Sequence, residues 1–149
     1  MPFKFEKLEV WQLSLDYTDD VEALASNLPK KERFNLSDQM RRAATSVSLN
    51  IAEGSTGQTD AEQARFLGMA LRSLIETVAC LYLVRRRSYA QKQTTASLYR
   101  QAETLAAKLQ SMRNALQPEK PWVREEATPY EAEERLDDGP LATDDGEPQ

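Results

Sequence analysis

Histidine sets the first limit on the chemistry of this chain, because none of its 149 residues is a histidine. Histidine is the commonest general base near neutral pH and the commonest metal ligand. Its absence excludes Ser-His triads, the usual zinc hydrolases and Glu-x-x-His di-iron bundles. The sequence also lacks a nucleophile motif and a phosphate-binding loop. It therefore predicts a protein that is not an enzyme and that holds no cofactor and no metal.

The side chains best suited to binding something are arginines in two groups. Arg41 and Arg42 are adjacent, so they point about 100° apart on a helix. Arg85, Arg86 and Arg87 close the third predicted helix. Arginine suits both phosphate contacts and structural ion pairs, and cations complement the carbonyl end of a helix. Both groups are candidate contacts to nucleic acid or a partner, with structural pairing as the alternative. If Arg41 and Arg85 to Arg87 were all paired internally, RNA binding would lose its physical basis.

A polar stripe runs beside the apolar stripe of residues 39–54, and it defines a second set of candidates. Asn50 lies at the margin of the apolar stripe, so its amide needs partners. Those partners lie either within the fold, which is the commoner case, or on another subunit or a ligand. The helix dipole disfavours an anion at Glu53, so an arginine from elsewhere is expected beside it. Gly54 is expected just past the helix end, with positive φ. The candidate interface or core residues on this stripe are Gln39, Ser46, Asn50 and Glu53.

Apolar residues at steps of three and four predict four helices that position these side chains. They are expected from about Glu6 to Asn27, from a cap at Asn35 or Ser37 to Ala52 or Glu53, from Asp60 to Arg87, and from Ser88 or Ala90 to Leu116. Thr59 and Glu62 form a capping box before the third helix. Because the links are short, the sequence predicts an all-α, antiparallel, up-down-up-down four-helix bundle over residues 1–117.

Charge divides the chain at Pro118. Residues 1–117 carry 16 Lys/Arg and 13 Asp/Glu, whereas residues 118–149 carry 3 and 11. The second part is rich in Pro, Asp, Glu and Gly and poor in apolar residues, which is typical of a disordered acidic tail. Trp122 and Val123 are its one anchor that could fold back onto the bundle.

The cellular location is expected to be the cytoplasm. The start of the chain has no apolar signal region, and no long uninterrupted apolar run predicts a membrane span. The one cysteine, Cys80, allows no internal disulfide and is expected to be an inert packing residue.

Five blocks in this order carry a resemblance to a known family: 5–12 (Phe-Glu-Lys-Leu-Glu-Val-Trp-Gln), 28–29 (Leu-Pro), 39–44 (Gln-Met-Arg-Arg-Ala-Ala), 50–54 (Asn-Ile-Ala-Glu-Gly) and 65–67 (Arg-Phe-Leu). Over residues 3–115 the chain resembles the four-helix-bundle proteins encoded in intervening sequences of bacterial large-subunit (23S) rRNA genes. The resemblance implies a cytosolic bundle that assembles as a ring-like homopentamer. It also implies a fold similar to the accessory proteins of diversity-generating retroelements. Two positions depart from the family pattern: Gly57, where a basic residue is frequent, and Arg72, where a glycine is frequent.

Two functions follow as hypotheses. In the first, a homo-oligomeric scaffold binds RNA or an RNA-handling protein, with the acidic tail competing for its basic surface. In the second, the chain is a structural or protein-binding module without a nucleic-acid partner, which the acidic overall balance favours. Neither hypothesis involves a membrane.

Overall fold

The computed structural model describes residues 3–57 and 59–117, and its fold is the predicted all-α four-helix bundle. Within these residues there is no strand. The predictions made for the tail, residues 118–149, lie outside the described residues. The elements are the 3₁₀ turns η1 (Lys4–Lys7) and η2 (Lys30–Glu32) and the helices α1 (Glu9–Ser26), α2 (Leu36–Gly54), α3 (Asp60–Arg86) and α4 (Lys92–Leu116).

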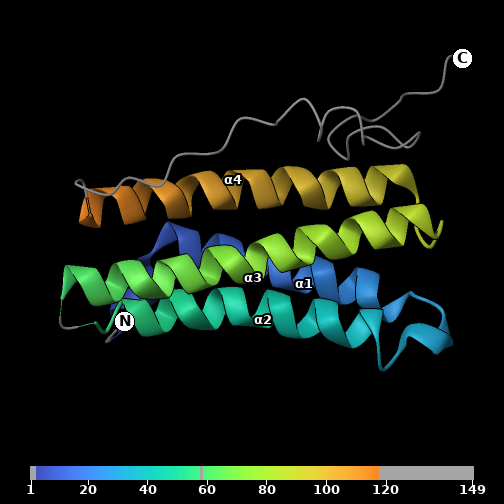
Figure 1. Cartoon of the computed structure of the whole chain (residues 1–149), viewed down its shortest axis with the longest axis horizontal. Coiled ribbons are helices and arrows are strands. Elements are labelled where there is room, and N and C mark those ends of the chain that lie inside the picture. Colours follow the sequence, from blue (N-terminus) through green and yellow to red (C-terminus); the bar gives the residue numbers. More distant parts are fainter. Residues whose placement is uncertain (1–2, 58, 118–149) are drawn as a thin grey trace, which may run out of the picture.

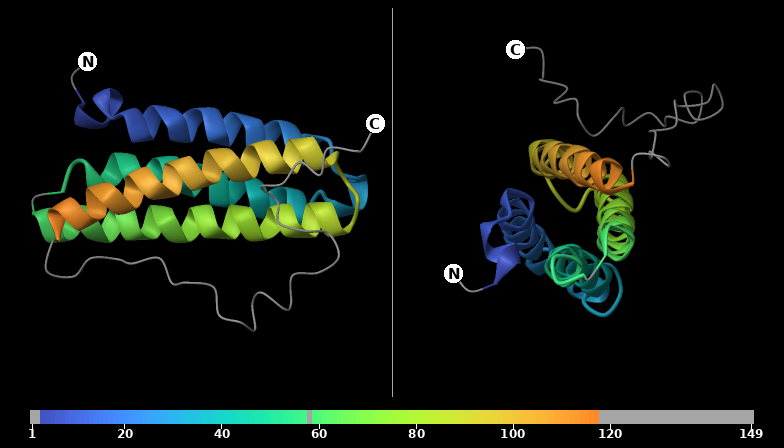
Figure 2. Two further views of the ribbon diagram at one scale, coloured as in Figure 1. Left: turned by 90° about the horizontal axis from the view of Figure 1, so that it is seen from above. Right: turned by 90° about the vertical axis from the view of Figure 1, so that its left-hand side faces the viewer.

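Consecutive helices run in opposite directions along one long axis, with their connections at alternate ends (Figure 1). Seen along that axis, the four helices form a ring in which each packs against the next and α4 returns to α1 (Figure 2). α3 lies between α2 and α4, and its contacts with these two helices are the most extensive helix contacts among the described residues.

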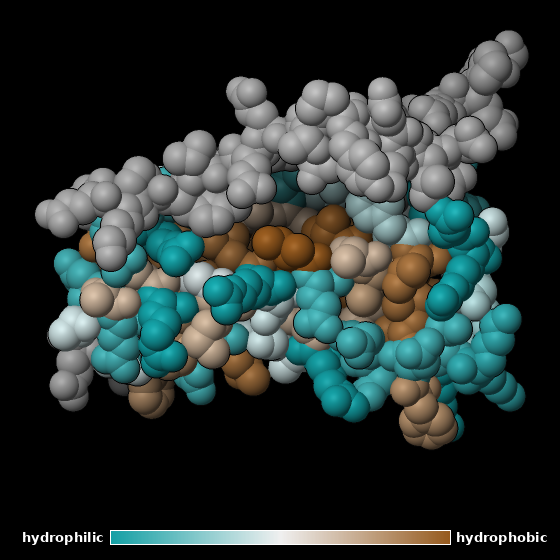
Figure 3. Space-filling model, in the orientation of Figure 1, coloured by the Kyte–Doolittle hydropathy of each residue, from teal (hydrophilic) through white to brown (hydrophobic). Residues whose placement is uncertain are grey.

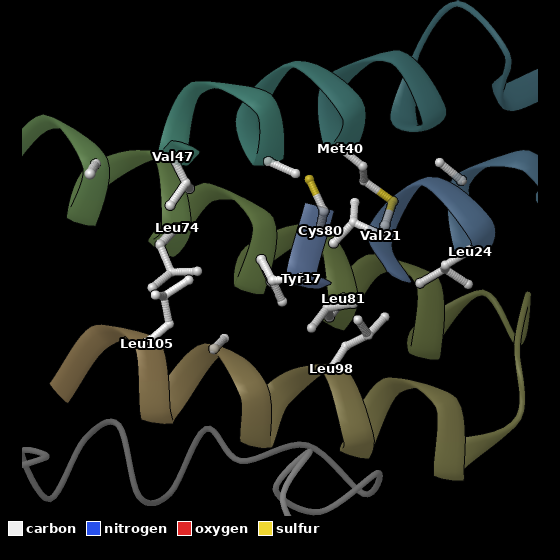
Figure 4. Packing of buried hydrophobic residues seen from close by; sticks show 14 of the residues in the cluster. Tyr17, Val21, Leu24, Met40, Val47, Leu74, Cys80, Leu81, Leu98 and Leu105 are labelled. Atoms are coloured by element: carbon white, nitrogen blue, oxygen red, sulfur yellow. The ribbon is translucent and has the colours of Figure 1, made fainter. Parts of the chain in front are cut away.

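The core consists of the predicted apolar stripes, which meet between the four helices (Figure 4). Cys80 belongs to this cluster, and burial raises the pKa of its thiol, as expected of a packing residue. One polar pair inside the core was not predicted from the sequence: the Tyr17 hydroxyl lies 2.6 Å from the Thr77 hydroxyl. Thr77 donates its proton to the Leu74 carbonyl, so Tyr17 must donate to Thr77. Burial raises the pKa of Tyr17 to about 12.

Two predicted helix starts are wrong. The first helix begins at Glu9 rather than Glu6, because the preceding residues form η1 and Leu8 is extended. The Phe5 ring packs edge-on against the Trp11 ring, with 4.7 Å between the ring centroids. This contact holds η1 against α1. The fourth helix begins at Lys92, because Ser88 takes a positive φ of 56° after α3 ends.

The end of α3 is a Schellman motif built without glycine. The Tyr89 amide donates to the Val84 carbonyl and the Ser88 amide to the Arg85 carbonyl, each at 3.0 Å. Such a turn uses several residues, so α4 starts later than its apolar pattern suggests.

Capping was predicted correctly at α3 and wrongly at α2. The Thr59 hydroxyl accepts from the Glu62 amide at 3.1 Å, which is one of the two bonds of the predicted capping box. Neither proposed cap of α2 accepts from the helix. Asn35 is the N-cap residue but has no capping bond, and Ser37 is buried and donates to the Ala25 carbonyl of α1 at 3.0 Å. The Ser37 hydroxyl therefore joins two helices instead of starting one.

α3 is more apolar than the sequence analysis predicted. By length and composition it is the one described helix that could cross a membrane, although core helices of soluble proteins pass the same test. Only 44% of its most apolar window is buried in the bundle. α3 therefore carries apolar side chains on its outer surface as well as toward the core.

Candidate interaction surface

Asn50 is satisfied within its own helix, which is the simpler of the two alternatives for this residue. Its side chain is 8% exposed, and its amide nitrogen donates to the Ser46 carbonyl at 2.8 Å and to the Ser46 hydroxyl at 3.0 Å. Ser46 in turn accepts from Ser73 of α3 at 2.9 Å. These bonds form a short polar chain between α2 and α3.

The rest of the polar stripe also lies along α3. The Gln39 amide donates to the Glu76 carboxylate of α3 at 3.2 Å. Glu53 is exposed, and no described residue forms an ion pair with it, so the arginine expected beside it is not found among residues 3–57 and 59–117. The stripe is thus mainly an internal contact between two helices, with Glu53 at its open end.

Gly54 has a different role from the one predicted. It is the last residue of α2, buried and helical rather than left-handed. A Cβ added there would lie 2.8 Å from the Cβ of Phe66 on α3. The absence of a side chain therefore allows the end of α2 to approach the start of α3 closely.

Arg41 and Arg42 are both paired within the chain. The Arg41 guanidinium donates to the Glu22 carboxylate of α1 at 2.7 Å and to the Ser26 hydroxyl at 3.1 Å. This pairing lowers the pKa of Glu22. Arg42 pairs with Asp38 of the same helix, and that carboxylate raises the pKa of Arg42.

The three arginines at the end of α3 have three different environments. Arg85 is only 7% exposed, and Arg86 is exposed to solvent. Arg87 donates to the buried Glu32 carboxylate at 3.3 Å, and Glu32 also accepts from the Tyr89 hydroxyl at 3.4 Å. Sequence reasoning missed Glu32, because it lies in η2, where no helical periodicity marks a buried position.

A groove of about 730 Å³ lies on the described surface between α3 and α4. Leu71, Val78, Ala102 and Ala106 contribute to its apolar lining. Figure 3 shows hydrophobic residues gathered where α3 runs beside α4. Sequence reasoning missed the groove. The signal was Ile75, an apolar residue outside the core seam, which is 60% exposed.

Charged side chains border this groove. Arg65, Arg72 and Arg113 line it together with a single acid, Glu103. At Gly68 a Cβ would lie 3.4 Å from the guanidinium carbon of Arg113, so the glycine gives Arg113 room to lie across α3. Arg65 and Arg72 thus belong to a basic border around an apolar surface.

The described residues offer no place for a metal ion. No group of three or more cysteine or acidic side chains comes together within residues 3–57 and 59–117. The surface instead has an apolar groove with a basic border.

Comparison with known proteins agrees with the helical geometry. The sequence pattern of the family described as "23S rRNA-intervening sequence protein" matches residues 6–111. The chain belongs to this family. A search of curated proteins found no match. The fold is similar to the crystal structure of a protein of unknown function from the S23 ribosomal protein family of Bacteroides thetaiotaomicron VPI-5482. The two share 27% identity and a TM-score of 0.66 over 70% of this chain and 97% of that one. The fold similarity to retroelement accessory proteins stays a prediction.

Proposed function

We propose that this chain is a non-catalytic, cytosolic scaffold that self-assembles by burying the outer surface of α3 and the adjacent groove against a second copy. The observation that carries the proposal is the groove itself, a hollow of about 730 Å³ with an apolar floor. An enzyme is not favoured, since the sequence lacks histidine and the described residues hold no metal-binding group.

The distribution of apolar residues on α3 supports assembly. Ile75 and Tyr82 are seven residues apart, so they lie on one face two turns apart, and they are 60% and 47% exposed. A helix that is apolar on nearly all sides is normally buried on nearly all sides. A second copy would bury this face, and the family resemblance makes a homopentamer the expected assembly.

The pairing of the candidate arginines favours protein over RNA as the partner. Arg41, Arg42 and Arg87 all have carboxylate partners, and phosphate contacts would have to replace these pairs. RNA affinity depends on cations that are available to phosphates. This argument supports the protein-binding hypothesis over the RNA hypothesis.

The test is size-exclusion chromatography with light scattering and absorbance at 260 and 280 nm, across protein concentration and salt. Ile75→Glu should lower the average mass toward that of a monomer, because it places a charge on the proposed interface. The matched control is Leu49→Glu, which makes the same change at a 58% exposed position on α2 outside the groove. An unchanged mass for Ile75→Glu, or equal losses in both variants, would contradict assembly through this face.

RNA binding remains a second candidate because of one cluster of cations. Lys30, Lys31 and Arg33 are exposed on and beside η2, and the Arg87–Glu32 pair brings this turn close to Arg86. We expect nucleic acid that co-elutes at low salt, leaves at high salt and is lost in a Lys31→Glu, Arg86→Glu variant if this candidate is correct. Absence of 260 nm absorbance at low salt would remove it.

A further inference from the structure

The groove between α3 and α4 has a candidate occupant within the same chain. Residues 118–149 follow directly after α4, and Arg113, in the last turn of α4, lines the groove. The start of this 32-residue segment is therefore anchored beside one end of the hollow. A tethered segment meets its site at an effective concentration in the millimolar range, which a free partner rarely reaches.

Charge is complementary between the two. The segment carries 11 Asp/Glu and 3 Lys/Arg. The groove is lined by Arg65, Arg72 and Arg113 against one acid, Glu103. Acidic side chains placed along this border would gain favourable contacts, because guanidinium groups pair well with carboxylates.

The segment also carries an apolar anchor within reach. Trp122 is five residues beyond Gln117, so an extended chain spans up to about 17 Å between them. The groove runs from Arg113 back to Tyr99 along α4, a rise of about 21 Å. Trp122 can therefore reach the apolar half around Leu71 and Ala106. A buried indole contributes a large apolar area, which suits a groove floor made of small and aliphatic side chains.

We propose that residues 118–149 bind in the groove of their own chain, with Trp122 on the apolar floor and acidic side chains beside Arg65, Arg72 and Arg113. The inference rests on the proposed function, because a second copy must displace this segment to use the same surface. The segment then sets the protein concentration at which assembly begins.

Docking is tested in the full-length chain by the fluorescence of Trp122. The only other tryptophan is Trp11, so Trp11→Phe leaves Trp122 as the sole reporter. In dilute solution we expect blue-shifted emission and slow quenching by acrylamide. Adding Ile75→Glu or Arg72→Glu should raise the quenching constant severalfold. Two matched controls, Leu49→Glu and Arg100→Glu, make the same changes outside the groove and should leave it unchanged.

Three results would overturn the proposal. The first is that acrylamide quenches Trp122 in the dilute Trp11→Phe protein as fast as it quenches free indole. The second is that the groove variants and the control variants change the quenching constant equally. The third is that Trp122 becomes shielded only as protein concentration rises. The last result would mean that the segment of one copy binds another copy.

Light scattering separates this inference from the proposed function. Trp122→Ser should lower severalfold the protein concentration at which assembly begins, because residues 118–149 would then compete less well with a second copy for the groove. If Trp122 is shielded while Ile75→Glu leaves the mass of the assembly unchanged, docking stands and the assembly face is wrong. If Ile75→Glu abolishes assembly while Trp122 is freely quenched, the assembly face stands and docking is wrong.

Discussion

The two sides of α3 meet their neighbours in opposite ways. Toward α2 the contact is closed by small and polar residues: Gly54 lies against Phe66, and Ser46 accepts from Ser73. Toward α4 the inner half is packed with leucines, but the outer half opens into an apolar groove bordered by arginines. α3 thus forms a closed contact with α2 and a partly open contact with α4.

This difference separates residues that hold the fold from residues that are available to a partner. Polar groups at the α2–α3 contact find partners within the bundle, as buried polar groups normally do. Apolar groups at the α3–α4 groove remain partly exposed, at a cost that a bound segment would remove. The polar stripe, the second set of candidates from sequence, is therefore mainly structural, and the groove is the better functional candidate.

The largest effect on stability is expected at the closed contact. Gly54→Ala should lower the free energy of unfolding by about 2 kcal/mol, because the new methyl group meets the Phe66 Cβ, which cannot move without its helix. Urea unfolding followed by circular dichroism measures this change.

Gly68→Ala is the matched control on the open side. The nearest atoms to its new Cβ belong to the flexible end of Arg113, at 3.4 Å, so a small shift accommodates it. Alanine also favours the helix over glycine by roughly 0.5 to 1 kcal/mol. Equal losses in the two variants would contradict the distinction between a closed and an open contact.

An intermediate effect on stability is expected at Tyr17, whose hydroxyl bonds to Thr77 and so links α1 to α3 inside the core. Tyr17→Phe should cost about 1 kcal/mol near neutral pH, the net value of one hydrogen bond. The pKa of Tyr17 is raised to about 12 in the fold from 10.0, so the unfolded chain loses its proton first as pH rises. Stability should therefore be fully present below pH 10 and fall between pH 10 and 12, by at most about 1.4 kcal/mol per pH unit.

The difference between parent and Tyr17→Phe isolates this titration from the other tyrosines. Urea midpoints measured from pH 8 to 11.5 should fall more steeply for the parent than for the variant above pH 10. Parallel curves would show that Tyr17 is not held neutral by burial.

The fold could be predicted from the sequence because it depends on periodicity that every turn repeats. Leu67, Leu74 and Leu81 on α3 occupy the core as their spacing requires. The site could not, because it depends on the distance between helices. A glycine at the end of a helix can serve either a positive φ or a close approach to another helix, and the sequence looks the same in both cases. At Gly54 the position of Phe66 in the structure identifies the second role.

Single-helix periodicity also cannot reveal where two helices diverge. Val78 lies within the core seam of α3 and Ile75 lies outside it, yet both line the groove, Val78 half-buried and Ile75 exposed. Glu32 is the converse case, a charged residue in a short turn that is buried because Arg87 and Tyr89 converge on it from beyond the end of α3.

The smallest effect is expected at the polar chain between α2 and α3. Ser73→Ala removes the donor to the Ser46 hydroxyl, which still accepts from Asn50. Serine is a poorer helix former than alanine, so exposed Ser111→Ala on α4 supplies the baseline for the gain in helix propensity. Relative to that baseline, Ser73→Ala and Ser46→Ala should each destabilise the bundle by about 0.5 to 1 kcal/mol. Because the two hydroxyls share one bond, the double variant should lose less than the sum of the two single losses. Additive losses would mean that the serines are tolerated at this contact for their small size alone, and that close approach at Gly54, rather than hydrogen bonding, closes this side of α3.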